Sequence, residues 1–171
     1  MSAHKIYCVS KTWWAAMWRD LRNEHSIPVI SSWIDHWTGE SNGNGWSSLP
    51  PVSPGGDLRR DLRDEHQGNL EPIRDWGAFW MRCLEEASTA TCALAYLAPG
   101  EQLVGGMAEI GAVLSHGGSV LAYGHHESLR TLAAHPRMRC RSRLEDFTTH
   151  PESMTAPERW LFDLANLVDG K

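Results

Sequence analysis

Short apolar runs alternate along this chain with longer stretches of helical periodicity. Short runs rich in β-branched and aromatic residues predict strands, and apolar residues three or four positions apart predict helices. We therefore expect strands at 5–10, 27–34, 91–97 and 119–123, with a short fifth at 138–140. Helices are expected at 13–24, 73–88, 107–115, 128–134 and 157–168. This alternation predicts an α/β protein with a Rossmann-like (flavodoxin-like) parallel sheet of about five strands and helices on both faces.

The stretch between the second strand and the second helix differs in composition. Residues 39–70 contain two clusters of glycine, proline, serine and asparagine, which are turn and breaker signals. A loop of this length inside a compact domain is usually functional or disordered. We predict one domain over 1–171 with a loop insertion at 39–70, which is either an active-site flap or a variable addition.

Composition narrows the class of protein. The chain has 171 residues, of which 42% are hydrophobic and 22% are charged, and its net charge is -5. These values suit one globular domain, and the lack of a Lys/Arg block argues against a nucleic-acid partner. The first residues lack the apolar core of a signal peptide, and no apolar run reaches bilayer-spanning length. We therefore expect a cytoplasmic protein with no membrane partner.

The cysteines give no sign of a metal site. They are widely spaced and form no CxxC pair, so neither a zinc site nor a disulfide framework is predicted. We expect no metal and no cofactor. The four positions are Cys8, Cys83, Cys92 and Cys140.

Polar and aromatic residues follow the carboxyl ends of the expected strands, where open parallel sheets bind ligands. Ser10 and Lys11 follow the first strand, and Trp33 and Asp35 close the second. Since parallel strands end at one edge of a sheet, residues after the third and fourth strands are candidates for the same site. This further set is Glu101, Gly105, Gly106, Met107, Glu109 and His125.

Glu109 is the sharpest candidate for chemistry. Gly105 and Gly106 permit a tight turn and a close backbone approach to a ligand. Glu109 is then expected in the first turn of a helix, where the helix dipole favours its ionised form. Gly111 lies inside the same helix, so we expect a packing reason for it. The alternative is that Glu109 is only a dipole-matched residue at a helix start.

The segment Gly105-Gly106-Met107-Ala108-Glu109-Ile110-Gly111-Ala112, followed by 118–124, resembles the signature of the nucleoside 2-deoxyribosyltransferase-like family. Residues 5–10 and 30–34 resemble its first and second strands, so the similarity runs in order over roughly 5–147. The resemblance implies a flavodoxin-like fold, a homodimer or larger oligomer, and a nucleoside or nucleotide substrate. It also implies that Glu109 is the nucleophile of a retaining mechanism that passes through a glycosyl-enzyme intermediate. Transfer to a second base and hydrolysis, for example of a deoxynucleoside monophosphate, both stay open.

One element of the family pattern is missing. An acidic residue near the third strand often assists the departing base in that family, but residues 91–98 contain no Asp or Glu. Asp35 and Glu101 are substitute candidates, and each is alternatively a solvated loop charge. This gap leaves a non-catalytic nucleotide-binding sensor as the alternative function.

The remaining candidates would bind substrate. Trp33 either stacks on a base or belongs to the core, and the Tyr7 hydroxyl either reaches the pocket or is part of the core. Ser10 and Lys11 lie where a phosphate or a sugar hydroxyl could be bound. By the resemblance, His125 occupies the place from which a neighbouring subunit donates a polar residue.

Overall fold

The structure is a computed structural model that describes residues 4–24, 27–37, 74–97, 103–123 and 129–141. The expected insertion at 39–70 and the expected helix at 157–168 lie outside these residues.

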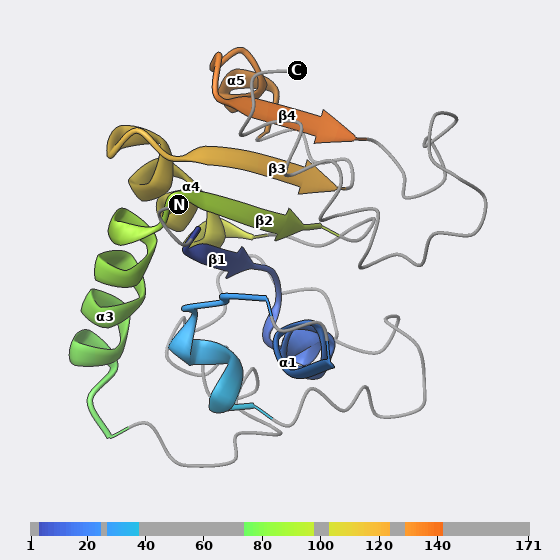
Figure 1. Cartoon of the computed structure of the whole chain (residues 1–171). Helices are drawn as coiled ribbons and strands as arrows, with labels where there is room; N and C mark the ends of the chain where they lie inside the picture. Colours follow the sequence, from blue (N-terminus) through green and yellow to red (C-terminus); the bar gives the residue numbers. More distant parts are fainter. Residues whose placement is uncertain (1–3, 25–26, 38–73, 98–102, 124–128, 142–171) are drawn as a thin grey trace, which may run out of the picture.

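Four parallel strands form the sheet in the described part of the chain (Figure 1). They are ordered β1-β2-β3-β4, and each neighbouring pair is parallel. Nearly every residue of the first three strands is buried, which explains why these strands are apolar throughout instead of alternating. The strands expected at 5–10, 91–97, 119–123 and 138–140 are confirmed as β1 (Ile6–Val9), β2 (Cys92–Tyr96), β3 (Ser119–Tyr123) and β4 (Met138–Arg141).

The strand expected at 27–34 is wrong. Val29 alone forms a bridge there, parallel to Ile6, on the edge of β1 that faces away from β2. The Ile6 amide donates to the Pro28 carbonyl at 3.0 Å, but the next amide of β1 in this direction, that of Cys8, donates to the Ser31 hydroxyl at 2.6 Å. A side chain thus replaces the backbone partner that a continuing strand would supply. The chain then turns into the 3-10 helix η2 (Ser32–Asp35).

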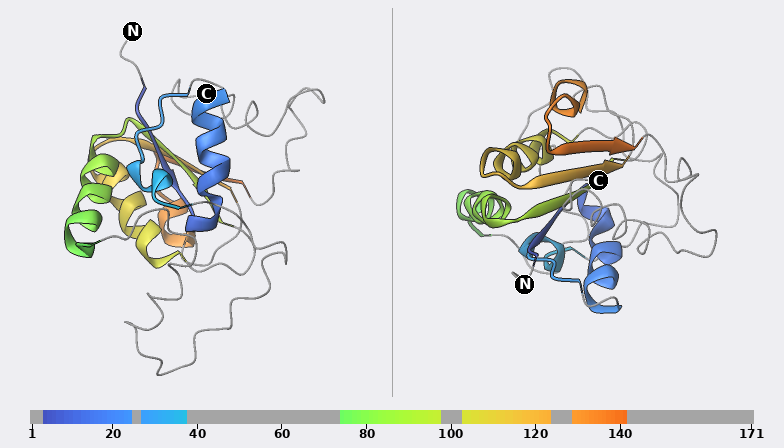
Figure 2. Two further views of the ribbon diagram at one scale, coloured as in Figure 1. Left: turned by 90° about the horizontal axis from the view of Figure 1, so that it is seen from below. Right: turned by 45° about the horizontal axis from the view of Figure 1, so that its top comes forward.

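Helices cover both faces of the sheet. The 3-10 turn η1 (Thr12–Trp14) leads into α1 (Ala15–Glu24), which lies on one face. The helices α3 (Trp76–Thr89) and α4 (Val104–Ser115) lie side by side on the opposite face (Figure 2). The short α5 (Leu129–Ala133) precedes β4 and packs against it. An α/β architecture with a parallel sheet is therefore confirmed.

Specific residues begin and end the two helices that matter for the site. The Asp75 side chain accepts a hydrogen bond from the Ala78 amide at 2.9 Å and caps the start of α3. Gly117 has φ +83°, a left-handed conformation that glycine adopts without strain, and it follows the end of α4. These signals set where α3 begins and where α4 ends.

Candidate functional site

A buried tyrosine–glutamate pair joins β1 to α4. The Tyr7 hydroxyl donates a hydrogen bond to Glu109 Oε1 at 2.7 Å. Tyr7 is completely buried and Glu109 is 7% exposed. A carboxylate in such surroundings needs a hydrogen-bond partner, and Tyr7 supplies one from the buried strand β1.

Glu109 does not lie in the first turn of its helix, contrary to the sequence-based expectation. The helix α4 begins at Val104, so Gly105 and Gly106 are helical and Glu109 falls in the second turn. The helix dipole acts mainly within the first turn, and it therefore contributes less here than expected. Burial, not the helix start, defines the environment of this carboxylate.

The glycines of this segment serve packing instead of a tight turn. A Cβ on Gly105 would lie 2.2 Å from the Trp80 ring, and one on Gly106 would lie 2.7 Å from Val9. Because neither glycine carries a Cβ, α4 can approach α3 and β1, and this close approach brings Glu109 to Tyr7. Gly111 is different, because a Cβ there would meet no atom within 4 Å, so the packing reason expected for it is wrong.

The surroundings change the protonation of both partners. Burial raises the pKa of Glu109 to about 7, the Tyr7 hydrogen bond opposes this rise, and the charge of Glu86 adds to it. Burial and the Glu109 charge raise the pKa of Tyr7, so its hydroxyl remains a donor at neutral pH. Glu109 is consequently poised to exchange a proton near neutrality, which is a common property of functional carboxylates.

Two residues of α3 complete the surroundings of the pair, and sequence reasoning missed both. The Cys83 thiol is buried beside Tyr7, and burial raises its pKa to about 12. Glu86 lies three residues further along α3, and its Oε2 accepts a hydrogen bond from the Ser32 amide at 2.9 Å. The apolar periodicity of 73–88 placed Cys83 on the buried stripe, but no sequence signal connected that stripe to Glu109.

Other predicted site residues have structural partners away from Glu109. The Ser10 hydroxyl accepts a hydrogen bond from Trp18 Nε1 at 2.7 Å and donates to the Lys11 carbonyl at 3.0 Å. Lys11 itself is the residue before η1. Trp33 is buried, and its Nε1 donates to the Cys8 carbonyl at 2.9 Å, which is the core alternative considered for it.

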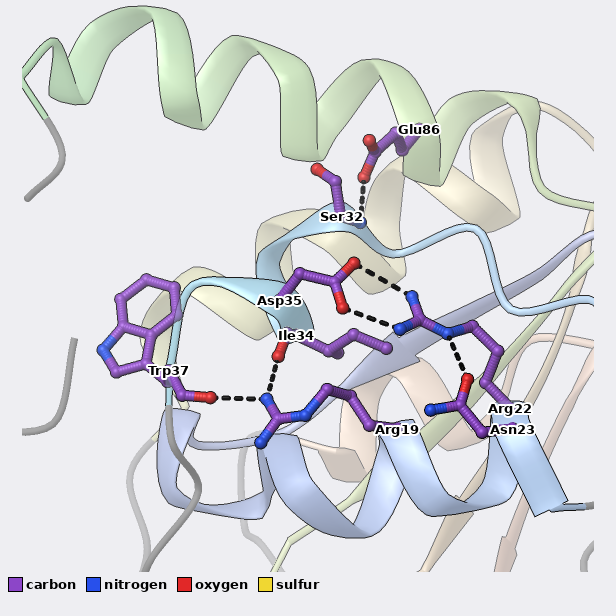
Figure 3. Close-up of polar contacts among 8 residues, drawn as sticks. All are labelled: Arg19, Arg22, Asn23, Ser32, Ile34, Asp35, Trp37 and Glu86. Atoms are coloured by element: carbon purple, nitrogen blue, oxygen red, sulfur yellow. Dashed lines mark hydrogen bonds and ion pairs between the residues drawn. The ribbon is translucent and has the colours of Figure 1, made fainter. Parts of the chain in front are cut away.

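Asp35 belongs to a surface ion pair. Its two carboxylate oxygens accept hydrogen bonds from the Arg22 guanidinium at 2.7 and 2.9 Å (Figure 3). The neighbouring Arg19 donates to the carbonyls of Ile34 and Trp37, so α1 and η2 are joined by two arginines. The Arg22 hydrogen bond lowers the pKa of Asp35, which therefore stays ionised. This engagement makes Asp35 a poor substitute for the missing acid.

Met107 lies in α4, partly buried against the core, one helical turn from Gly111. Glu101 and His125 lie outside the described residues. The structure therefore brings Tyr7, Gly105, Gly106 and Glu109 together.

The described residues include no group of three or more His, Cys, Asp or Glu side chains arranged to bind a metal. None of the helices in the described part of the chain combines the length and apolarity that a bilayer crossing requires. Comparison with protein-family models, curated protein sequences and solved structures finds no match to this chain.

Proposed function

We propose that this chain cleaves or exchanges the N-glycosidic bond of a deoxynucleoside, nucleoside or nucleotide, with Glu109 as the nucleophile. The observation that carries the proposal is the buried Tyr7–Glu109 pair, with 2.7 Å between hydroxyl and carboxylate. The family resemblance of the Gly105–Ala112 segment supports it independently.

The finer fold belongs to the same proposal. If the bridge at Val29 is counted as a vestigial strand, the chain order across the sheet becomes that of the flavodoxin-like doubly wound fold. In that fold, ligands bind outside the carboxyl ends of the strands. The helix α4 begins after the carboxyl end of β2, and its residue Gly106 packs on Val9 at the end of β1. A homo-oligomeric state and a cytoplasmic location stay predictions.

The proposed reaction has two steps. A Glu109 carboxylate oxygen forms a bond to the anomeric carbon, and the bond from that carbon to the base nitrogen breaks with its electron pair on the base, which takes up a proton. Water or the nitrogen of a second base then attacks the anomeric carbon, the bond to Glu109 breaks with its electron pair on the carboxylate, and the attacking atom loses its proton to solvent. Tyr7 fixes one carboxylate oxygen by its hydrogen bond, so the position of the nucleophile is set before substrate binds.

The alternative function is a non-catalytic nucleotide-binding sensor. Two observations favour it: β2 carries no acid to protonate a departing base, and Asp35 is occupied by Arg22. The high pKa of Glu109, about 7, also leaves much of the nucleophile protonated near neutrality. A sensor would use Glu109 as a hydrogen-bonding group and would need no leaving-group acid.

A base-release assay separates the two functions. The protein is incubated with a panel of deoxynucleosides, ribonucleosides and their monophosphates, with and without an acceptor base, and free base is followed by chromatography. Release without acceptor identifies a hydrolase, and exchange that needs acceptor identifies a transferase. Glu109→Gln and Glu109→Ala are expected to abolish turnover and to keep the fold, as judged by circular dichroism.

Two results would overturn the proposal. Unchanged turnover in either Glu109 variant would remove the nucleophile assignment. Absence of release from every substrate, together with a ligand that raises the melting temperature, would establish the sensor instead.

A further inference from the structure

The exposed side of α3 and α4 carries an apolar patch that the proposed reaction does not use. In the described part of the chain, the large hydrophobic side chains that solvent reaches are Trp80, Met81 and Val104, which are 39%, 66% and 81% exposed. The first two belong to α3, and Val104 begins α4. The two helices lie side by side on one face of the sheet (Figure 2). Single exposed apolar side chains are common, but a group of them on one face indicates a contact surface.

These side chains form one continuous surface. A Cβ on Gly105 would lie 2.2 Å from the Trp80 ring, so this ring rests on the first turn of α4. Met81 follows Trp80 in α3, and Val104 precedes Gly105 in α4. Trp80 therefore joins the exposed residues of α3 to those of α4. Ala108 lies one helical turn after Val104, is exposed as well, and extends the patch along α4.

The patch lacks charge, and its border on α3 carries both signs. Glu109 is the only charged residue of α4, and it is buried, so the exposed side of α4 is uncharged. On α3, the exposed residues Arg82 and Glu85 follow Met81 by one and four positions. An uncharged surface bordered by one cation and one anion suits neither a nucleic acid nor an anionic lipid surface, because both are bound by clustered cations.

The same charge pattern is complementary to itself. In a twofold pair, residue i of one copy contacts residue j of the other, and j contacts i in return. An apolar patch then meets its own copy without burying a charge, and a border with one arginine and one glutamate places opposite charges within reach across the axis. A border of a single sign would instead repel its copy. The pattern therefore favours a second copy of this chain as the occupant.

The size of this face sets the expected strength of the contact. The helix α3 has 14 residues and α4 has 12, so they are about 21 and 18 Å long, and packed helix axes lie about 8–10 Å apart. Together they present a face of roughly 20 by 20 Å, and two such faces bury on the order of 1,000 Å². This area is at the lower end for specific interfaces, so it favours a dimer with a micromolar Kd over a permanent one.

We propose that two copies of this chain pair through the outer face of α3 and α4, with Trp80, Met81, Val104 and Ala108 at the centre of the interface. The small side chain of Ala108 lets helices of the two copies approach closely there. The pairing goes beyond the proposed function and holds whether or not Glu109 is a nucleophile, because the four patch residues take no part in the proposed reaction.

Sedimentation velocity of the full chain over about 1 to 100 µM tests the pairing. Ala108→Glu and Val104→Glu each place a carboxylate on the patch of both copies. The matched control is Ala78→Glu, because Ala78 is also an exposed residue of α3 but lies two positions before Trp80, on a different side of that helix. All three positions are exposed, so each variant should fold, which circular dichroism checks.

The expected result is a monomer–dimer equilibrium in the unmodified chain, with the dimer fraction rising with concentration. Ala108→Glu and Val104→Glu should each raise the Kd by about tenfold or more, because the interface would then bury two unpaired carboxylates. Ala78→Glu should change the Kd by less than about twofold, since a charge outside the interface contributes little.

Two results would overturn this pairing. A monomer at every concentration would leave the patch to a different partner, and a dimer with the same Kd in Ala108→Glu and Val104→Glu would place the interface elsewhere on the chain. The measurement needs no turnover, so the pairing and the glycosidic function are decided separately. A dimer that the patch variants dissociate, with no base release from any substrate, would keep the interface and remove the proposed reaction.

Discussion

Replacing Glu109 by glutamine should abolish base release and yet stabilise the folded protein above neutral pH. Glutamine has nearly the same shape as glutamate and keeps an oxygen that accepts the Tyr7 hydrogen bond, but it does not ionise. Burial raises the pKa of Glu109 from an ordinary value of 4.5 to about 7. Between these pH values the folded protein binds a proton that the unfolded chain has released. The free energy of unfolding therefore falls as pH rises through this window, and it is fully restored below about pH 4.5.

The size of the effect follows from the same pKa values. A difference of about 2.5 pKa units, at about 1.4 kcal/mol per unit, corresponds to about 3 kcal/mol. This energy opposes folding of the unmodified protein above about pH 7 and is absent from Glu109→Gln. Any cost of burying the glutamine amide is the same at every pH. The pH dependence of the difference in free energy of unfolding between Glu109→Gln and the unmodified protein therefore reports the ionisation of Glu109 alone.

Urea unfolding followed by tryptophan fluorescence measures this difference at about pH 5 and about pH 8. From about pH 5 to about pH 8, the free energy of unfolding of Glu109→Gln should rise relative to that of the unmodified protein by up to about 3 kcal/mol. Glu85→Gln, on an exposed position of α3, is the control and should show no comparable gain. A stability difference that is equal at both pH values would refute the assignment of a buried, proton-binding Glu109.

Three further predictions concern the surroundings of the site. Gly106→Ala should destabilise the fold by about 1–3 kcal/mol, because its Cβ would meet Leu103 and Val9. Gly111→Ala has open space around it and should stabilise α4 by up to about 1 kcal/mol. A chemical denaturation series that ranks the two variants the other way would contradict this packing. Asp35→Asn should change stability by less than about 1 kcal/mol and leave base release intact, since its ion pair with Arg22 is partly exposed; a large loss of turnover in the kinetic assay would restore Asp35 to the site. Tyr7→Phe should raise the pKa of Glu109 by about one pKa unit and move the acid limb of the kcat/KM profile to higher pH, and an unmoved limb would show that the hydrogen bond does not control the nucleophile.

The sequence predicted most of the described fold because its elements obey simple periodicities. Central strands such as β2 and β3 are apolar on both faces, and a run of that kind bounded by breakers is a clear signal. The segment around Val29 carries the same local signal but forms a single bridge. The pairing with β1 stops because the Ser31 hydroxyl accepts the hydrogen bond of the Cys8 amide. A contact between residues this far apart is not encoded in any local pattern.

The site was predicted in part, for a related reason. Glu109 stood out because of the glycines that precede it, and Tyr7 was named as a residue whose hydroxyl either reaches the pocket or belongs to the core. The purpose of the glycines was missed, since their partners Trp80 and Val9 come from other elements. Cys83 was missed as well, because a cysteine on an apolar stripe is indistinguishable from core until α3 is placed against α4.

The central claim is that Glu109 forms a covalent bond to the sugar, and trapping that bond tests it most directly. The protein is incubated with a nucleoside that carries fluorine at the sugar 2-position, which destabilises the oxocarbenium-like transition state and slows release of the glycosyl group. Peptide mass spectrometry should then find the added mass of the fluorinated sugar on the peptide containing Glu109, and no adduct in Glu109→Gln. Release of base with no adduct on Glu109, or an adduct that persists in the variant, would contradict the mechanism.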